Sequence, residues 1–371
     1  MSKRAKKVLS LVFLACMILS LLSGCGKSGS STDGESSDPL KIGFVATAAP
    51  TEYGYNLSVY NGVEYLKEVY PDAEIVWVDN VPDSGNESAT VMENMVRDGC
   101  KIIFATSFGY LDSTAALAEK YPDVYFLHCS QGEVYVDNMT RYDITTWDAN
   151  YVAGFVAGSM SKSGQIGYVA AQPIPTVLSS VNSYALGAKR ANPNATINLF
   201  FTNSWADPSL EKQAAQSLVE SGCDVLGQFC DSPATQQVAA DSNIYSTGFH
   251  VDMRQFGPNS NLTGFMYNWG ALYVGEVEKY LSGDWKGISL VPGMIEGCAD
   301  IAPINEIVPQ EIRDAADGIK QDIINGDFVV FSGEIKDNEG NVRVAAGETL
   351  SFDELAAMDW LVDNVVGASL G

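Results

Sequence analysis

The stretch KIGFVATAAPTEYGYN, residues 41–56, determines how the rest of the chain is organised. Its first six residues are mostly apolar and predict a short buried strand, and a loop containing Pro50 then ends in Tyr53 and Tyr55. An amphipathic helix follows, whose apolar face carries residues at helical spacing: Val59, Val63, Leu66 and Val69. In open α/β sheets a ligand binds beyond the carboxyl ends of the strands, where loops of this kind lie. The stretch therefore predicts a strand, a loop in one wall of a cleft, and a helix.

Strands and helices alternate along the remaining chain at the spacing of βαβ units. Strands are predicted at 75–78, 101–106, 124–129, 165–171, 196–201, 224–229, 244–248 and 262–267, the last as a sheet edge. Helices are predicted at 88–97, 112–121, 148–162, 176–190 and 271–281, and one more begins at Pro208. Asp112, Asp148 and Asp207 stand where they can cap three of these helices. We therefore expect an α/β fold of two lobes with parallel sheets, joined by crossovers that form a hinge.

The C-terminal segment departs from this alternation. Residues 334–344 predict a hairpin that turns at 338–341. Ser351 and Glu354 match a capping box ahead of a last helix. The apolar residues of this helix are predicted to be Leu355, Met358, Leu361 and Val362. We interpret the hairpin and helix as packing elements without chemistry of their own.

Residues 1–24 have the parts of an export signal, with basic residues followed by an apolar run at 8–22. The run ends in LSGC, which resembles the lipobox of bacterial lipoproteins, where cleavage precedes the cysteine and a lipid is attached to Cys25. An ordinary secretory signal that happens to contain this cysteine is the alternative. Residues 25–39 are rich in Gly and Ser and predict a flexible tether. The folded chain is expected to divide into lobe 1, at 40–146 plus about 270–300, and lobe 2, at 147–269 plus about 301–371. We expect an extracytoplasmic protein held at the membrane by its lipid alone.

The charge of the chain argues against nucleic acid as a partner. Its formal net charge is −24, and removal of residues 1–24 takes away four cations and leaves a net charge near −28. Such a charge repels nucleic acid and anionic lipid. The sequence also contains no phosphate-binding loop, no Gly-x-Ser-x-Gly elbow and only two histidines, so we expect neither an enzyme nor a metal or cofactor.

Five cysteines follow Cys25, and no two have the spacing of a zinc or redox pair: Cys100, Cys129, Cys223, Cys230 and Cys298. Several fall in or beside predicted buried strands, where a free cysteine acts as a small apolar filler. A disulfide remains the alternative in an exported protein.

Candidate binding residues are those that follow predicted strands, together with residues near the crossover at about 268. The set comprises Tyr53, Tyr55, Asn56, Ser107, Phe108, Gly109, Trp205, Asp231, His250, Asp252 and Trp269. Aromatic faces from two lobes, accompanied by a few hydrogen-bonding groups, suit a planar heterocycle. A base held in this way gains about 1–3 kcal/mol per stacking contact.

Several of these side chains have a structural alternative. Tyr53 and Tyr55 are also typical of surface turns, and Trp205 of a hydrophobic staple before the helix that Asp207 begins. Asp207 itself is either a helix cap or a ligand contact. His128 lies inside a predicted strand and is interpreted as a core histidine, whereas His250 lies in a strand-end loop and fits both interpretations.

Several segments, in order, resemble the basic membrane protein (BMP) family of lipoproteins. They are SFG at 107–109, the helix at 151–163 with GQIG at 164–167, VAAQPIP at 169–175, NSWADP at 203–208 and GFHVDM at 248–253. The resemblance extends over roughly 41–371. It implies a type I periplasmic-binding-protein fold, with two Rossmann-like parallel-sheet lobes joined by a hinge. It also implies an extracytoplasmic receptor that delivers a small-molecule solute, typically a purine nucleoside, to an ABC permease and its ATPase.

The resemblance places the two aromatics that clamp the base in the nucleoside-binding branch at Tyr55, followed by Asn56, and at Trp205. The acidic pair of that branch reads His250-Val251-Asp252 here, and its lysine is absent, with Tyr267-Asn268-Trp269 in that region. Because these groups hold the ribose, the resemblance favours a free purine base such as adenine. A ligand sensor for a membrane signalling partner and a nucleoside-cleaving enzyme are the alternative functions.

Overall fold

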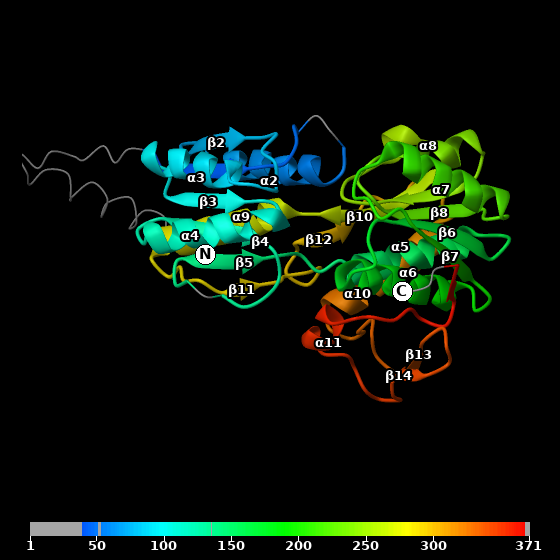
Figure 1. Cartoon of the computed structure of the whole chain (residues 1–371). Coiled ribbons are helices and arrows are strands. Elements are labelled where there is room, and N and C mark those ends of the chain that lie inside the picture. The colour runs from blue at the N-terminus through cyan, green and yellow to red at the C-terminus, as the bar shows by residue number, and fades with distance from the viewer. Residues whose placement is uncertain (1–38, 51–52, 135, 368–371) are drawn as a thin grey trace, which may run out of the picture. The chain divides into compact units, whose positions relative to one another are not determined.

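The protein is described here by a computed structural model that covers residues 39–50, 53–134 and 136–367 (Figure 1). The predicted export signal, Cys25 and the predicted tether up to residue 38 lie outside the described residues. Within the described ranges, no helix is long and apolar enough to cross a membrane.

The first lobe is built on a parallel sheet with the strand order β11-β5-β4-β3-β1-β2. Its strands are β1 (Lys41–Val45), β2 (Glu74–Val78), β3 (Ile102–Ala105), β4 (Tyr125–Cys129), β5 (Met139–Tyr142) and β11 (Ser289–Leu290). Its helices are α2 (Tyr55–Val69), α3 (Glu87–Arg97), α4 (Leu111–Lys120) and α9 (Trp269–Ser282). Alternate strand residues face opposite layers, so Phe44 packs with α2 and α9 while Val45 packs with the apolar residues of α3 and α4.

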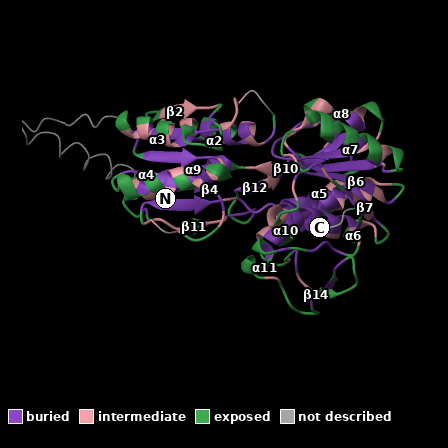
Figure 2. Cartoon of the chain, viewed as in Figure 1, coloured by how far each residue is buried: buried purple, intermediate pink, exposed green. Residues whose placement is uncertain are grey.

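The second lobe is built on a sheet with the order β12-β10-β9-β8-β6-β7-β15, parallel except for the pairing of β12 with β10. Its strands are β6 (Gln165–Ala170), β7 (Thr196–Phe201), β8 (Val225–Phe229), β9 (Tyr245–Gly248), β10 (Asn261–Tyr267), β12 (Ala299–Ile301) and β15 (Val365–Val366). Its helices are α5 (Trp147–Met160), α6 (Pro175–Ala191), α7 (Pro208–Glu220), α8 (Ala234–Asp241) and α10 (Gln310–Ile324). Figure 2 shows both sheets buried beneath helices with exposed outer faces.

Glycines allow two helices of the second lobe to pack closely. A Cβ at Gly154 of α5 would lie 2.0 Å from the carbonyl oxygen of Tyr184 in α6, and one at Gly158 would lie 2.5 Å from that of Ala188. The absence of a side chain at these two positions therefore lets α5 and α6 approach closely.

The described chain crosses between the lobes at 142–147, 267–269 and 290–299. The first and third crossovers run side by side, because Asp143 N donates to Leu290 O at 3.0 Å and Thr145 N donates to Pro292 O at 2.9 Å. Two parallel-sheet lobes with these crossovers confirm the predicted fold class.

The C-terminal segment contains the predicted hairpin, β13 (Ile335–Lys336) and β14 (Val342–Val344), and a helix α11 (Phe352–Ala356). The capping box of Ser351 and Glu354 is present. The predicted helix is wrong beyond Ala356, because Met358, Leu361 and Val362 are buried in irregular chain that leads to β15.

Four local predictions are corrected. Asp112 does not cap α4, because a 3-10 turn at Phe108–Tyr110 starts the helix earlier and places Asp112 in its first turn. Asp148 likewise lies in the first turn of α5 and not at its cap. Strand β10 is not a sheet edge, because β12 pairs with it. Val69 is 40% exposed, whereas Val59, Val63 and Leu66 are buried as predicted.

Candidate functional site

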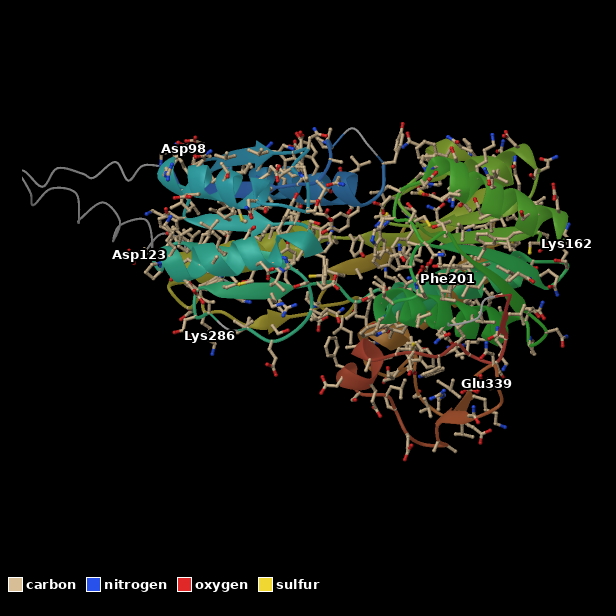
Figure 3. The ribbon with its side chains drawn as sticks, viewed as in Figure 1. Asp98, Asp123, Lys162, Phe201, Lys286 and Glu339 are labelled. Carbon is tan, nitrogen blue, oxygen red and sulfur yellow. The ribbon has the colours of Figure 1, made fainter. Side chains whose placement is uncertain are left out.

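The carboxyl ends of the parallel strands in the two lobes face each other. Asp98 and Asp123 precede β3 and β4 and lie at the outer end of the first lobe, and Lys162, which precedes β6, lies at the outer end of the second (Figure 3). The lobes meet where Gly54 approaches Asp231, since a Cβ at Gly54 would lie 2.3 Å from the Asp231 carbonyl oxygen.

Tyr55, the first residue of α2, lies at the centre of the contact between the lobes. Its hydroxyl is 2.7 Å from the carbonyl oxygen of Thr106 and 3.1 Å from Cys129 Sγ, and so reaches the ends of β3 and β4. Its ring stands nearly perpendicular to those of His250 and Tyr267, with centroids 6.3 and 6.2 Å away. Burial raises the pKa of the Tyr55 hydroxyl well above its ordinary value, so it remains a neutral donor.

His250 and Asp231 face Tyr55 from the second lobe. His250 is 3% exposed and has φ +73°, a left-handed conformation that costs free energy in a non-glycine residue. Its Nε2 lies 2.8 Å from Asp231 Oδ1 without the alignment of a hydrogen bond, so neither ring nitrogen has such a partner among the described residues. The imidazole stacks on Tyr267, with centroids 5.6 Å apart. The two ring nitrogens of His250 are therefore available to form hydrogen bonds with a solute.

Trp205 lies at the edge of this cluster and is 46% exposed. Its ring is 6.4 Å from that of Phe229, which in turn lies 6.2 Å from His250. The Trp205 carbonyl oxygen accepts a hydrogen bond of 3.0 Å from Asp231 N. The structure thus joins Trp205 to the aromatic cluster of Tyr55 through Phe229 and His250.

Three predicted site residues are engaged in the framework. Trp269 is 1% exposed, stacks on Tyr267 at 4.7 Å and donates from Nε1 to Ser58 Oγ at 3.0 Å, so it supports the cluster from behind. Asn56 Oδ1 accepts hydrogen bonds from the loop after β1, at Thr47 Oγ1 and Ala48 N. Asp252 is held in an ion pair with Arg254, with Oδ2 at 2.9 Å from Nε.

The remaining predicted site residues are Tyr53, in the loop before α2, and three residues that follow β3. The Tyr53 ring meets Phe256 edge-on at 4.5 Å, a contact between the lobes. Ser107, Phe108 and Gly109 follow β3, where Phe108 is 74% exposed and Gly109 packs on the backbone of the loop after β2.

Other sequence interpretations are resolved by hydrogen bonds and burial. Asp207 Oδ1 accepts from the backbone of Ser209 and Leu210 and so caps α7. His128 is fully buried with Nδ1 2.8 Å from Ser130 Oγ, and burial lowers its pKa to about 4, which confirms a core histidine. The five described cysteines are unpaired, as predicted.

Asp143 belongs to the cluster and was not predicted. It follows β5 at the first crossover, where Oδ2 accepts a hydrogen bond of 2.9 Å from Gln131 Nε2. Burial raises its pKa to about 6. Burial also raises the pKa of Tyr267, and the charges of Asp143 and Asp231 both add to that rise, so two carboxylates flank this tyrosine. A strand-end position is the sequence signal for Asp143, but β5 itself was not recognised.

The cluster therefore offers aromatic faces from both lobes and carboxylates that accept hydrogen bonds. In the described ranges no three His, Cys, Asp or Glu side chains are grouped to hold a metal ion. Such a site suits a flat molecule that carries hydrogen-bond donors at its edge.

Comparisons with known proteins agree with this architecture. The sequence model of a family described as Bmp, ABC transporter substrate-binding protein PnrA-like, matches residues 40–334. The chain is 33% identical over 350 residues to a purine-binding protein of Brucella abortus, covering 94% of this chain and 98% of that protein. It is 31% identical over 313 residues to a putative ABC transporter glucose-binding protein of Haloferax volcanii, covering 84% of this chain and 78% of that one.

Two solved structures share the fold. An ABC transporter solute-binding protein from Conexibacter woesei has a TM-score of 0.68 at 19% identity and covers 78% of this chain and 98% of its own. A transcriptional activator of the comK gene from Bacillus halodurans has a TM-score of 0.69 at 21% identity and covers 78% of this chain and 99% of its own. At such identities the likeness shows the fold alone.

Proposed function

Because the chain belongs to the Bmp family of PnrA-like ABC-transporter substrate-binding proteins, we propose that it delivers a purine-like solute to an ABC importer. Proteins of this family are extracytoplasmic receptors that bind small solutes and interact with a permease, and they are not enzymes. The proposed solute is a purine base or nucleoside held between the two lobes, whose closure presents it to the permease and its ATPase.

The aromatic cluster around Tyr55 is the observation that carries this proposal. Its rings come from both lobes, and the carboxyl groups of Asp143 and Asp231 lie beside them as potential hydrogen-bond acceptors. A purine presents flat faces and N–H donors at its edge, which complement these groups. The similarity to a purine-binding protein over 94% of the chain supports the same class of solute.

A free base fits better than a nucleoside. Ribose hydroxyls need acceptors and donors of their own, and Asp252, the acid that remains in the His250-Val251-Asp252 motif, is paired with Arg254. Adenine, with its exocyclic amino group and ring N–H, is therefore the first solute to test.

The test of the solute uses the full chain purified from membranes in detergent. Denaturation of the protein would release a co-purified purine, which mass spectrometry would identify. Thermal shifts would be measured with adenine, guanine, hypoxanthine, adenosine, inosine and glucose. A bound solute at a hundredfold excess over its Kd stabilises the folded protein by about 2.7 kcal/mol. Tyr55→Ala should abolish the shift, whereas Tyr65→Ala, on the same helix with a half-exposed ring, should retain it.

A thermal shift with glucose alone would mean that the solute is a sugar and not a purine, which is the class of solute in the name of the Haloferax volcanii relative. A shift with none of the compounds would refute the purine proposal. Normal purine uptake by cells that lack the protein, with an altered transcriptional response to purine, would favour the ligand sensor instead.

We also propose that Cys25 carries the lipid anchor. Its position after LSG at the end of an apolar run is the support for this assignment. Growth with radiolabelled palmitate should label the protein, and Cys25→Ser should lose the label and release the protein from the membrane. Equal labelling of Cys25→Ser would disprove the anchor.

A further inference from the structure

A buried glutamate lies directly behind the Asp231 loop. Glu211, in the first turns of α7, is fully buried, and its Oε2 accepts a hydrogen bond of 2.5 Å from Ser232 Oγ. Its other oxygen, Oε1, is buried without a hydrogen-bond partner among the described residues. A buried carboxylate with one unpartnered oxygen is costly in its charged form, so a proton on that oxygen is favoured.

The loop that Glu211 holds is fixed by side-chain amides. Gln228 Nε2 donates to the carbonyl oxygens of Cys230 and Ser232, at 2.9 and 3.0 Å. Gln236 Nε2 donates in turn to Gln228 Oε1 and to the carbonyl oxygen of Thr247, both at 2.8 Å. These bonds connect the ends of β8 and β9, from which Asp231 and His250 extend. A change in the charge of Glu211 therefore acts on a loop that these hydrogen bonds hold in place.

The charge of Asp231 is the main one that faces Glu211. Burial is the main cause that raises the pKa of Glu211, the hydrogen bond from Ser232 opposes the rise, the charge of Asp231 adds to it, and the resulting pKa is about 7. The Cys230 thiol is the other titratable group beside it on the β8–α8 connection. Strand β6 contains no charged residue, α8 carries only Asp241 at its last position, and the carboxylate of Asp207 is engaged in capping α7.

We propose that Glu211 is a positioning residue that holds Asp231 through Ser232 and releases its proton to the medium when a solute donates a hydrogen bond to Asp231. The inference rests on the proposed function, because it requires a solute with an N–H donor at this carboxylate. The hydrogen bond disperses part of the negative charge of Asp231 and so weakens the repulsion that helps to keep the proton on Glu211. The carboxylate that results accepts a stronger hydrogen bond from Ser232 and holds the loop more firmly around the solute.

The direction of the pH dependence follows from this linkage. Since binding releases a proton, affinity rises as the pH rises across the neutral range. With an unliganded pKa of about 7, a decrease of half a unit to one unit in the pKa of Glu211 on binding corresponds to a gain of about two- to fivefold in affinity between pH 6 and pH 8.

Calorimetry of adenine binding to the full chain tests the proposal. Measurements at pH 7 in buffers of different ionisation enthalpy give the number of protons released, expected to be a sizeable fraction of one for the unmodified protein and near zero for Glu211→Gln. The affinity of Glu211→Gln should be flat between pH 6 and pH 8. Glu220→Gln, an exposed glutamate at the end of the same helix, should behave as the unmodified protein. Equal proton release by Glu211→Gln and the unmodified protein would overturn the inference.

Two further measurements decide the matter if Glu211→Gln folds poorly or adenine does not bind. Ser232→Ala removes the hydrogen bond that lowers the pKa of Glu211, so the midpoint of the pH dependence should move to higher pH, and an unmoved midpoint contradicts the role. Carbon NMR of labelled glutamate in the unliganded protein should show one carboxyl that titrates near neutrality. If all glutamates titrate below about pH 5, the inference fails whatever the solute, whereas absence of binding by every purine defeats the proposed function alone.

Discussion

Replacing Gly54 by Ala tests whether the approach of the two lobes at Asp231 is part of the solute-bound state. Gly54 has φ +82° and ψ −135°, which an alanine adopts only with strain of about 1–3 kcal/mol. A Cβ at this position would also lie 2.3 Å from the Asp231 carbonyl oxygen, and contacts shorter than 3.0 Å essentially never occur. The carbonyl would have to withdraw by at least about 0.7 Å, and the amides of Gln228 and Gln236 hold its loop against that movement.

The strain acts on folding, whereas the clash acts only when the lobes are close together. We therefore expect Gly54→Ala to lower the affinity for adenine at least about tenfold, or 1.4 kcal/mol, beyond any loss of stability. Gly222→Ala is the matched control, because Gly222 has φ +94° and nothing lies within 4 Å of its added Cβ. Calorimetric titration and urea unfolding of both variants separate the two effects. If Gly54→Ala binds as tightly as Gly222→Ala, the approach at Asp231 is not required for binding.

Three further outcomes follow from single side chains. Tyr55→Phe leaves the carbonyl oxygen of Thr106 without its donor, so the free energy of unfolding should fall by about 1 kcal/mol in urea, and an unchanged midpoint would contradict that bond. Asp143→Asn should remove a pH dependence of stability: burial raises the folded pKa to about 6 from an ordinary 3.8, so the carboxyl group lowers the free energy of unfolding by about 1–3 kcal/mol as pH rises from 4 to 6. Parallel melting curves of variant and unmodified protein across that window would refute it. Asn182→Ala removes the hydrogen-bond partners of Trp360 O and Val362 N, so the free energy of unfolding should fall by about 2–3 kcal/mol and protease should cleave the C-terminal segment. A C-terminal segment that stays intact under conditions that cleave other loops would contradict this role.

The sequence was sufficient for most of the alternation of strands and helices because most strands are continuous apolar runs, although helices α8 and α10 were not predicted. Strand β5 was missed because MTRY contains a charged residue, and nothing in the sequence indicates that Arg141 is 8% exposed. Its guanidinium is buried by hydrogen bonds to Ser130 Oγ and to the carbonyl oxygen of Glu133, contacts that only the folded loop creates. The length of the last helix was overestimated because buried apolar residues at helical spacing also occur in irregular chain.

The candidate site was predictable where an aromatic side chain follows a strand, as Tyr55 and Trp205 do. The sequence did not distinguish a ring that lines the site from one that packs beneath it, so Trp269 was predicted to bind the ligand, whereas in the structure its side chain is buried. The sequence also gave no reason to prefer Asp231 over Asp252 as a ligand contact. The difference between them is that Asp252 is held in an ion pair with Arg254. Partners and burial are properties of the tertiary structure, and these decide which acid is available to a solute.

Under the proposed function, the acidic groups of the site favour closure of this acidic protein, with its formal net charge of −24, on a neutral solute. Asp143, Asp231 and Glu211 come from different elements, and burial raises the pKa of the first and the last. The charged forms of Asp143 and Glu211 are therefore unfavourable to the extent that their hydrogen bonds do not offset their burial. A solute that donates hydrogen bonds to Asp143 and Asp231 relieves that cost in both lobes at once. The free energy of binding then comes partly from strain already present in the empty site, which favours closure over a solute with donors and disfavours closure over an anion.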